Sequence, residues 1–343
     1  MRVGLFDHPL FREHDAGPGH PDGPARLDAI REGLRAAGLE ARLRLWSPAP
    51  ALDDDLLRVH SADHLALVAR SEGRRLRLDA DTETGPRSHE AARLAVGGVV
   101  EAVDRVLDGD LERAFCLARP PGHHAEAGRA MGFCLFNNVA VAAAHALAQG
   151  LERVLVVDFD VHHGNGTQQA FWDDPRVLYV SSHAWPFYPG TGGLEETGAG
   201  AGAGWTLNLP MPMGLGDAEY AAVYREIVAP AARRFDAQLV LVSAGFDAWD
   251  GDPLAGMRVR EQGFAAVATA CLEAAAGSAR GRAVFVLEGG YSLAGLARGS
   301  QAVVSCLLGD SHPQPPPEAA HDARLTALLA AYRRQHGAFW RLA

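Results

Sequence analysis

Acidic residues and histidines alternate within residues 151–168, LERVLVVDFDVHHGNGTQ. The apolar run at 154–157 is typical of a strand buried on both faces of a parallel sheet. Asp158, Asp160 and His162 are spaced two residues apart, so on an extended backbone their side chains point to the same side. An unpaired buried carboxylate is costly, and a divalent cation would remove that cost. Asp160 and His162 offer one oxygen and one nitrogen, a mixed donor set that suits zinc.

Polar residues also follow three other segments that we expect to be strands. In an open parallel sheet, the carboxyl ends of the strands form the edge where ligands bind. Each residue alone could cap a turn, pack on a loop or lie on the surface, but four strands delivering such residues to one edge indicate a single site. The residues are His123 and His124 after the strand at 113–118, Asp247 after the strand at 238–243, and Glu288 and Tyr291 after the strand at 283–287.

The residue types in this set fit the hydrolysis of an amide. Asp247 would complete an Asp/His/Asp metal set and leave room for a water and a substrate oxygen. A bound zinc ion lowers the pKa of such a water towards about 7 and polarises a carbonyl group. His123 and His124, with Asp158 nearby, suit the transfer of a proton to the leaving amine. Tyr291 can donate its hydroxyl to the developing oxyanion. The pattern therefore predicts a metal-dependent amide hydrolase.

The elements that must position these residues alternate between strands and helices from residue 113 onward. Strands are expected at 1–7, 113–118, 154–157, 176–181, 238–243 and 283–287. The segment at 20–27 is expected to be a turn that leads into a helix ending at Arg35, with Asp22 as a cap. Further helices are expected at 61–70, 89–107, 137–148, 166–172, 218–235, 261–276 and 293–308. The polar segment at 79–86, DADTETGP, carries no structural signature. This order predicts an α/β fold with a largely parallel sheet and helices on both faces.

The length of 343 residues suits one large α/β domain or two smaller ones. We expect a catalytic domain at 1–310, followed at 311–343 by a Pro-rich spacer and a C-terminal helix. Leu325, Leu328, Leu329 and Tyr332 form an apolar stripe on that helix, which must dock on the body or on another subunit. A homo-oligomer is therefore one alternative.

Composition excludes several other classes of protein. The four cysteines stand singly in apolar segments, which is typical of reduced core residues in a cytoplasmic protein and not of a disulfide framework. No apolar run reaches membrane-spanning length, and residues 1–6 are predicted to be a strand, not a signal peptide. The formal net charge of −10 argues against a nucleic-acid partner. We expect neither a membrane nor a nucleic-acid function.

Four segments resemble motifs of the zinc-dependent histone deacetylase family and its acetylpolyamine amidohydrolase relatives. They are RPPGHHAEAGRAMGFCLFNNVAVAA, VDFDVHHGNGTQ, SAGFDAWDGDPLAG and LEGGY. The resemblance covers most of the chain, from HPDGPARL to LEGGY. HPDGPARL and the Asn of HHGNG are similar to the class II branch, which includes the bacterial histone deacetylase-like amidohydrolases. The resemblance implies the arginase–deacetylase fold, a single domain around a largely parallel sheet.

The resemblance implies two metal sites. Zinc would be held by Asp160, His162 and Asp247. A structural potassium ion would be held, partly through backbone oxygens, by Asp158, Asp160, His162, Ser181 and Ser182.

The resemblance also implies the catalytic roles. His124 would be the general base and acid, and His123 would be an electrostatic partner held by Asp158. Asn165 stands where other branches have Asp, so the residue that orients His124 would be neutral here. Tyr291 would bind the oxyanion.

Aromatic residues match the walls of the family's acyl-lysine tunnel. They are Phe133 and Tyr188. Gly132, which precedes Phe133, is also expected to bind the substrate. The family usually has Phe at the place of Tyr188, so the added hydroxyl bears on the polarity of the tunnel and on the preferred acyl group. Class II polyamine enzymes have a Glu at the pocket mouth that pairs with the distant ammonium group. Leu254, in GDPLAG, stands at that place and cannot form this pair.

These residues favour an acyl-lysine peptide or a small acylamine as the substrate, and three alternatives remain. The first is an acetylpolyamine deacetylase. The second is an arginase-like enzyme with two manganese ions, although the acidic spacing around Asp247 departs from that pattern. The third is an inactive acyl-lysine binding module, which the presence of Tyr291 argues against.

Overall fold

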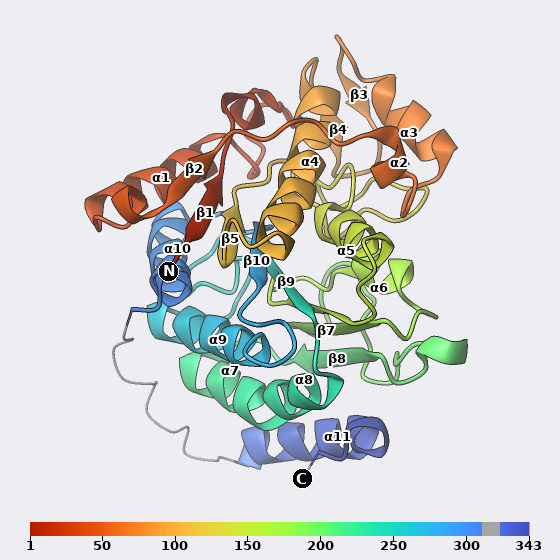
Figure 1. The fold of residues 1–343 in the computed structure, drawn as a ribbon, viewed down its shortest axis with the longest axis vertical. Helices are drawn as coiled ribbons and strands as arrows, with labels where there is room; N and C mark the ends of the chain where they lie inside the picture. The colour runs from red at the N-terminus through yellow and green to blue at the C-terminus, as the bar shows by residue number, and fades with distance from the viewer. Residues whose placement is uncertain (311–322, 343) are drawn as a thin grey trace.

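The computed structural model, which describes residues 1–310 and 323–342, contains an eight-stranded parallel sheet (Figure 1). The strand order is β2-β1-β5-β10-β9-β6-β7-β8, and every neighbouring pair is parallel. The strands are β1 (Val3–Phe6), β2 (Arg44–Trp46), β5 (Arg113–Cys116), β6 (Val154–Asp158), β7 (Val177–Ala184), β8 (Thr206–Met211), β9 (Leu239–Ala244) and β10 (Ala283–Leu287). The central strands β6, β9 and β10 are buried along their whole length, as continuous apolar runs in a parallel sheet should be.

Helices cover both faces of this sheet (Figure 1). On one face lie α4 (Ser88–Leu107) and α5 (Asn138–Ala148). On the other face lie α1 (Ala25–Ala36), α7 (Asp217–Val223), α8 (Ala229–Phe235), α9 (Glu261–Ala274) and α10 (Leu293–Leu308). The shorter elements are α2 (Asp53–Leu56), α3 (Ala62–Ala69), α6 (Asn165–Ala170) and a hairpin of β3 (Leu76–Arg77) and β4 (Glu83–Thr84). The predicted α/β fold is confirmed.

The local structure differs from the prediction at several places. The helix expected at 218–235 is divided by a π-helical turn, Tyr224–Val228, because Pro230 has no N–H to continue the regular ladder. Strands β2 and β8 were not predicted; β8 contains Pro210, which is tolerated because β8 lies at the sheet edge. The segment at 79–86, expected to be featureless, contributes β4 to the small hairpin.

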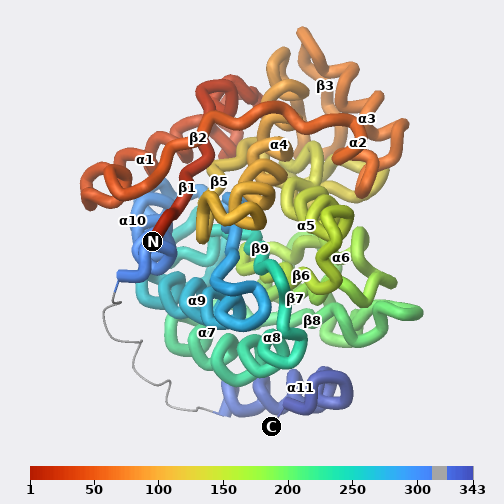
Figure 2. Tube along the Cα trace, in the orientation of Figure 1, coloured from red at the N-terminus to blue at the C-terminus, as the bar shows by residue number. Residues whose placement is uncertain are grey.

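The C-terminal helix α11 (Ala323–Trp340) docks on the body of the same chain (Figures 1 and 2). Leu325, Leu329 and Tyr332 of the predicted apolar stripe are buried, and Leu328 is half-buried. Docking on the body is thus the alternative that the structure supports. The Pro-rich spacer lies outside the described residues, and the domain boundary at residue 310 stays a prediction.

Helix α11 covers the outer edge of β8 with polar side chains from one helix face. The Tyr332 hydroxyl donates to Pro210 O at 2.9 Å, and His336 Nε2 lies 3.0 Å from Asn208 O. Trp340 Nε1 donates to the carbonyl of Gly204, just before β8, at 2.8 Å. The helix residues are four apart, and Pro210 and Asn208 carry alternate carbonyls of the strand that point away from β7. The helix therefore takes the place of a ninth strand.

Among residues 1–310 and 323–342, no helix is long and apolar enough to cross a membrane.

We expect Trp340→Ala to destabilise the protein by about 3 kcal/mol, the usual scale for truncating a buried aromatic side chain. Trp340 is 6% exposed and packs against the rings of Trp205 and Phe235 at 5.2 and 6.4 Å. Urea unfolding measures the change. Arg334→Ala, at an exposed position of the same helix, is the matched control and should change stability by less than about 0.5 kcal/mol. Equal midpoints for both variants would show that α11 does not stabilise the body.

Candidate active site

The four groups of polar residues come together because their strands are neighbours. Strands β5, β10, β9 and β6 are adjacent in the sheet, and their carboxyl ends lead into the four groups. A pocket of about 250 Å³ opens at this edge. It is lined by Asp81, Pro121, His123, His124, Gly132, Phe133, His162, Phe187, Tyr188, Leu254, Gly289 and Tyr291.

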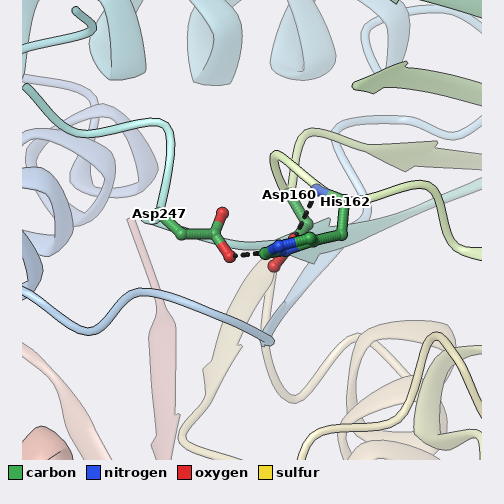
Figure 3. Close-up of side chains that lie close together, drawn as sticks. All are labelled: Asp160, His162 and Asp247. Atoms are coloured by element: carbon green, nitrogen blue, oxygen red, sulfur yellow. Dashed lines mark hydrogen bonds and ion pairs between the residues drawn. The ribbon is translucent and has the colours of Figure 1, made fainter. Parts of the chain in front are cut away.

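The three predicted metal ligands converge at the base of this edge. Asp160, His162 and Asp247 place one donor atom each within 4.8 Å of one another. His162 Nδ1 lies 3.1 Å from a carboxylate oxygen of each aspartate, and Figure 3 shows Asp247 facing His162 from the opposite loop. Each aspartate also accepts a backbone N–H at 2.8 Å, from Gly289 to Asp160 and from Val161 to Asp247. These bonds fix the carboxylates before any ion binds.

Two glycines make room for the three ligands. A Cβ atom at Gly245 would lie 2.0 Å from Asp160 Oδ2, and one at Gly289 would lie 2.1 Å from Asp247 Oδ2. A larger residue at either place would push a carboxylate out of the cluster. The donor set of two carboxylates and one imidazole, together with this cradle, fits a divalent metal ion.

Electrostatics shows that the cluster requires positive charge. Burial opposes protonation of His162, but its hydrogen bonds to Asp160 and Asp247 outweigh burial and raise its pKa to about 10. Burial and the adjacent charge of Asp160 raise the pKa of Asp247 to about 7. Two buried carboxylates repel each other unless a cation lies between them. A metal ion would supply the charge that a proton on His162 otherwise supplies.

The adjacent histidines have different partners. His123 Nδ1 lies 3.0 Å from Asp158 Oδ2, and His124 Nδ1 lies 2.8 Å from Asn165 Oδ1. Asn165 Nδ2 donates to Glu126 Oε1 at 2.8 Å, and only the amide nitrogen can donate to a carboxylate. The amide oxygen therefore faces His124, which must carry its proton on Nδ1. The other ring nitrogen, Nε2, is left free to accept a proton.

The same contacts separate the charges of the two histidines. Burial disfavours the charged form of His123, but Asp158 and Asp160 outweigh it and raise the pKa of His123 to about 10. Burial and the nearby His123 and His162 lower the pKa of His124 well below its ordinary value. At neutral pH, His123 is an imidazolium and His124 is a neutral base. Pairs whose environments drive their pKa values apart are typical of acid–base sites.

Glu288 and Arg26 fix the backbone on either side of the pocket. The buried Glu288 carboxylate accepts N–H bonds from Gly122 at 2.7 Å and from His123 at 3.2 Å, and its pKa is raised to about 7 by burial. The Arg26 guanidinium donates to the carbonyls of Gly290, at 2.7 Å, and Glu288. These bonds hold the loops that carry the histidine pair and Tyr291.

Tyr291 is half-buried at the pocket, with the Arg26 guanidinium 5.1 Å from its ring centroid. Burial raises the pKa of Tyr291 well above its ordinary value, so the phenol keeps its proton and can donate it in a hydrogen bond. Asp22, expected to cap α1, instead pairs with Arg26 at 2.6 Å and Arg119 at 3.3 Å. The buried guanidinium groups require that carboxylate, so the capping prediction was wrong.

All four residues of the predicted substrate-binding set line the pocket. The Tyr188 ring lies 5.2 Å from that of His124, and the Phe133 ring lies 5.9 Å from that of Tyr291. Leu254 is half-buried and lies at the pocket, not in the core. A Cβ atom at Gly132 would lie 2.3 Å from His124 Cδ2, so this position must stay free of a side chain.

Several pocket residues were missed in sequence. Phe187 stacks on His162 with ring centroids 5.2 Å apart, and Asp81 comes from a segment that carried no signature. Asp252 accepts backbone N–H bonds from Leu254, Tyr291 and Ser292, which ties two pocket loops together. Phe187 is next to Tyr188 in the sequence, and this could have indicated it. Asp81 and Asp252 contact residues that are distant in the sequence, so no local pattern marks them.

The predicted potassium residues are close but their role stays a prediction. Asp158 and Ser181 are paired in register between β6 and β7, and both are buried. The Ser181 hydroxyl lies 2.9 Å from His183 Nδ1, and the Ser182 hydroxyl lies 2.9 Å from the Tyr224 hydroxyl. Those side chains have partners, so an ion here would rely on backbone oxygens.

Comparison with known proteins agrees with this geometry. Residues 20–307 match the family model of the histone deacetylase domain. The chain belongs to the histone deacetylase family. It is 44% identical over 297 residues to a histone deacetylase-like amidohydrolase of Pseudomonas aeruginosa, covering 86% of this chain and 78% of that protein. The matched residues span most of the chain, so the family's domain makes up most of it.

Relatives from a plant and from a mammal are longer than this chain. The chain is 40% identical to histone deacetylase 5 of Arabidopsis thaliana, with 99% of this chain aligned but only 54% of the plant protein. It is 44% identical to the polyamine deacetylase HDAC10 of Mus musculus, over 85% of this chain and 45% of the mouse protein. The chain thus spans about half of these relatives. The crystal structure of the HDA15 HD domain superposes with a TM-score of 0.91 at 34% identity, covering 99% of this chain and 95% of that one.

We expect the purified protein to bind one divalent metal ion through the Asp/His/Asp cluster, and Asp247→Ala to lose it. Removing one of three protein ligands leaves two donors, too few for a stable site. Elemental analysis after dialysis measures the content. Asp250→Ala is the matched control, because Asp250 lies in the same loop but pairs with Arg260 at the surface. Full metal content in Asp247→Ala would exclude this ligand set.

Proposed function

We propose that this protein is a zinc-dependent hydrolase that removes acetyl or other short acyl groups from acyl-lysine or related acylamines. The observation that carries the proposal is the placement of an Asp/His/Asp cluster, a neutral histidine and a protonated tyrosine around one narrow pocket. Membership of the histone deacetylase family and the name of the Pseudomonas relative support the same reaction type.

Zinc is the proposed metal because its usual ligands are imidazole nitrogen and carboxylate oxygen, and catalytic zinc sites keep a position open for water. When bound, it would supply an activated water and polarise the acyl carbonyl. A structural potassium ion beside Asp158 and Ser181 is the second proposed ion.

The residues of the chain divide the remaining work. His124 Nε2 takes the proton of the attacking water and returns it to the leaving amine. His123, charged and paired with Asp158, keeps His124 neutral before the first transfer and, by repelling a second positive charge, favours return of the proton to the leaving amine. Asn165 holds the ring in the tautomer that leaves Nε2 free. Tyr291 donates its hydroxyl to the oxyanion, the kind of contact that strengthens in the transition state.

The pocket lining supports a substrate with an apolar stem. Phe133, Tyr188 and Leu254 would contact the methylene chain of an acylated lysine. An acetylpolyamine substrate is the second candidate, favoured by the 44% identity to the mouse polyamine deacetylase. Leu254 weighs against it, because a leucine offers nothing to a distant ammonium group. A deacylation screen of acetyl-lysine peptides against acetylated putrescine and spermidine separates the two.

The surroundings of the enzyme are also proposed. Four buried cysteines without disulfides support a cytoplasmic location. The net charge of −10 supports the absence of a nucleic-acid partner. We propose no membrane partner, and a homo-oligomer remains an alternative.

We expect His124→Ala to abolish turnover but to keep the metal, because no other group returns the proton to the leaving amine. Tyr291→Phe should lower kcat by two to three powers of ten, the usual effect of losing one oxyanion donor. Single-turnover kinetics with elemental analysis of each variant measures both effects. Near-normal turnover by Tyr291→Phe would mean that another group holds the oxyanion.

We expect Leu254→Glu to improve the ratio of acetylspermidine to acetyl-lysine turnover several-fold. An exposed ion pair at the pocket mouth contributes about 1 kcal/mol or less, and salt weakens it. Both substrates are assayed at low and high ionic strength, with Leu254→Gln as the uncharged control. The gain should shrink as salt is raised. An unchanged ratio in a folded, metal-loaded variant would show that residue 254 does not set this preference.

A further inference from the structure

Phe133, one of the pocket walls, has an unusual backbone conformation. Its φ is +68°, and that of Gly132 is +56°, so two consecutive residues lie in the left-handed region. Glycine enters this region freely, but a residue with a large side chain does so only when its surroundings fix it. A specific set of contacts must therefore hold the Phe133 wall.

The hairpin of β3 and β4 supplies those contacts. Gly132 N–H donates to Asp81 Oδ1, and Phe133 N–H donates to Thr82 Oγ1, both at 3.1 Å. The Thr82 hydroxyl donates in turn to Asp81 Oδ1 at 2.8 Å. Thr82 is 1% exposed, so water cannot easily replace these bonds. The two side chains thus bind both N–H groups of the strained pair, and we call them the Asp81–Thr82 clamp.

Asp81 also contacts the other aromatic wall. Burial and the charge of the Asp81 carboxylate raise the pKa of Tyr188, and both residues line the same pocket. A phenylalanine at position 188 would have no hydroxyl to face this carboxylate. The Asp81 carboxylate therefore binds the backbone of one aromatic wall and lies on the same pocket as the other.

We propose that the Asp81–Thr82 clamp positions the Phe133 wall, and that Thr82 is a positioning residue for substrate affinity. This inference rests on the proposed deacylase function. The clamp binds the backbone of Gly132 and Phe133, on the wall side of the pocket. It fixes the surface that would contact the methylene chain of the substrate. It takes no part in proton transfer, which is carried out by His124.

The expected effect of removing the Thr82 hydroxyl is on binding. Thr82→Val keeps the size of the side chain but leaves the part-buried Phe133 N–H without an acceptor. KM for an acetyl-lysine peptide should rise about tenfold, the scale of one lost buried hydrogen bond. The value of kcat should stay within about twofold, because loss of contacts made equally in ground and transition states raises KM alone.

Thr84→Val is the matched control. Thr84 lies in the same hairpin, is fully buried, and has its hydroxyl bonded to the backbone N and O of Leu76 at 3.1 and 3.2 Å. It loses hairpin bonds of the same kind but none to the pocket wall. Thr84→Val should have the same KM as the unaltered protein. Thr82→Ser, which retains the hydroxyl, should also have that KM. A KM for Thr84→Val as high as that of Thr82→Val would reduce Thr82 to a general stabiliser of the hairpin.

A double-mutant cycle decides whether Thr82 acts through the Phe133 ring. In a Phe133→Ala background, adding Thr82→Val should raise KM by less than about twofold, because the wall is already absent. A full tenfold rise in that background overturns the inference, as does an unchanged KM in the single Thr82→Val variant.

Hydrogen exchange of the backbone amides provides a test that needs no activity. Thr82→Val should speed exchange at Gly132 and Phe133 at least tenfold, while Thr84→Val should not. If Thr82→Val does not fold, Asp81→Ala replaces it, and exchange at Gly132 should then be faster. Unchanged exchange overturns the clamp. If the unaltered protein turns over no acylamine, the proposed function fails, and the exchange measurement still decides whether the clamp exists.

Discussion

Two carboxylates that repel each other, buried at the carboxyl edge of a parallel sheet, are the constraint on which the site depends. Asp160 and Asp247 are 1% and 0% exposed, so water does not screen their charges. Positively charged side chains and backbone N–H groups that point at the carboxylates stabilise them. His162 and His123 carry raised pKa values, and Gly289 and Val161 each donate an N–H. The same arrangement that makes the carboxylates tolerable makes them ligands.

The neutral state of His124 follows from this constraint. Because His123 is charged by its contact with Asp158, a second proton on the adjacent ring is strongly disfavoured. Asn165 then orients the ring without adding a charge, and Glu126 fixes which way its amide faces. The charges around the metal cluster thus act through a short series of contacts to keep His124 a neutral base at the pocket. The chain ends at Glu126, where the loop meets solvent.

The sequence allowed the sheet and the positions of the metal, histidine and tyrosine residues to be predicted, because both rest on local signals. Apolar runs such as 154–157 mark buried parallel strands, and residues directly after such strands must lie at one edge. The rest depends on contacts between distant segments. Arg26 reaches Gly290 across more than half of the chain, and Thr82 reaches Phe133 from a segment of polar residues. Strand β8 contains Pro210, and a proline is tolerated in a strand at the edge of a sheet, a position that only the folded chain defines.

The covering of β8 by α11 closes one edge of the sheet. Four residues of helix advance about 6.0 Å, and two residues of a parallel strand advance about 6.6 Å. The two repeats are close enough for Tyr332 and His336 to meet the alternate carbonyls of Pro210 and Asn208. Trp340, four residues further along the helix, bonds to Gly204, outside the strand. An uncovered strand edge is a template for pairing with a strand of another chain, so the near match of the two repeats keeps β8 from seeding such aggregation.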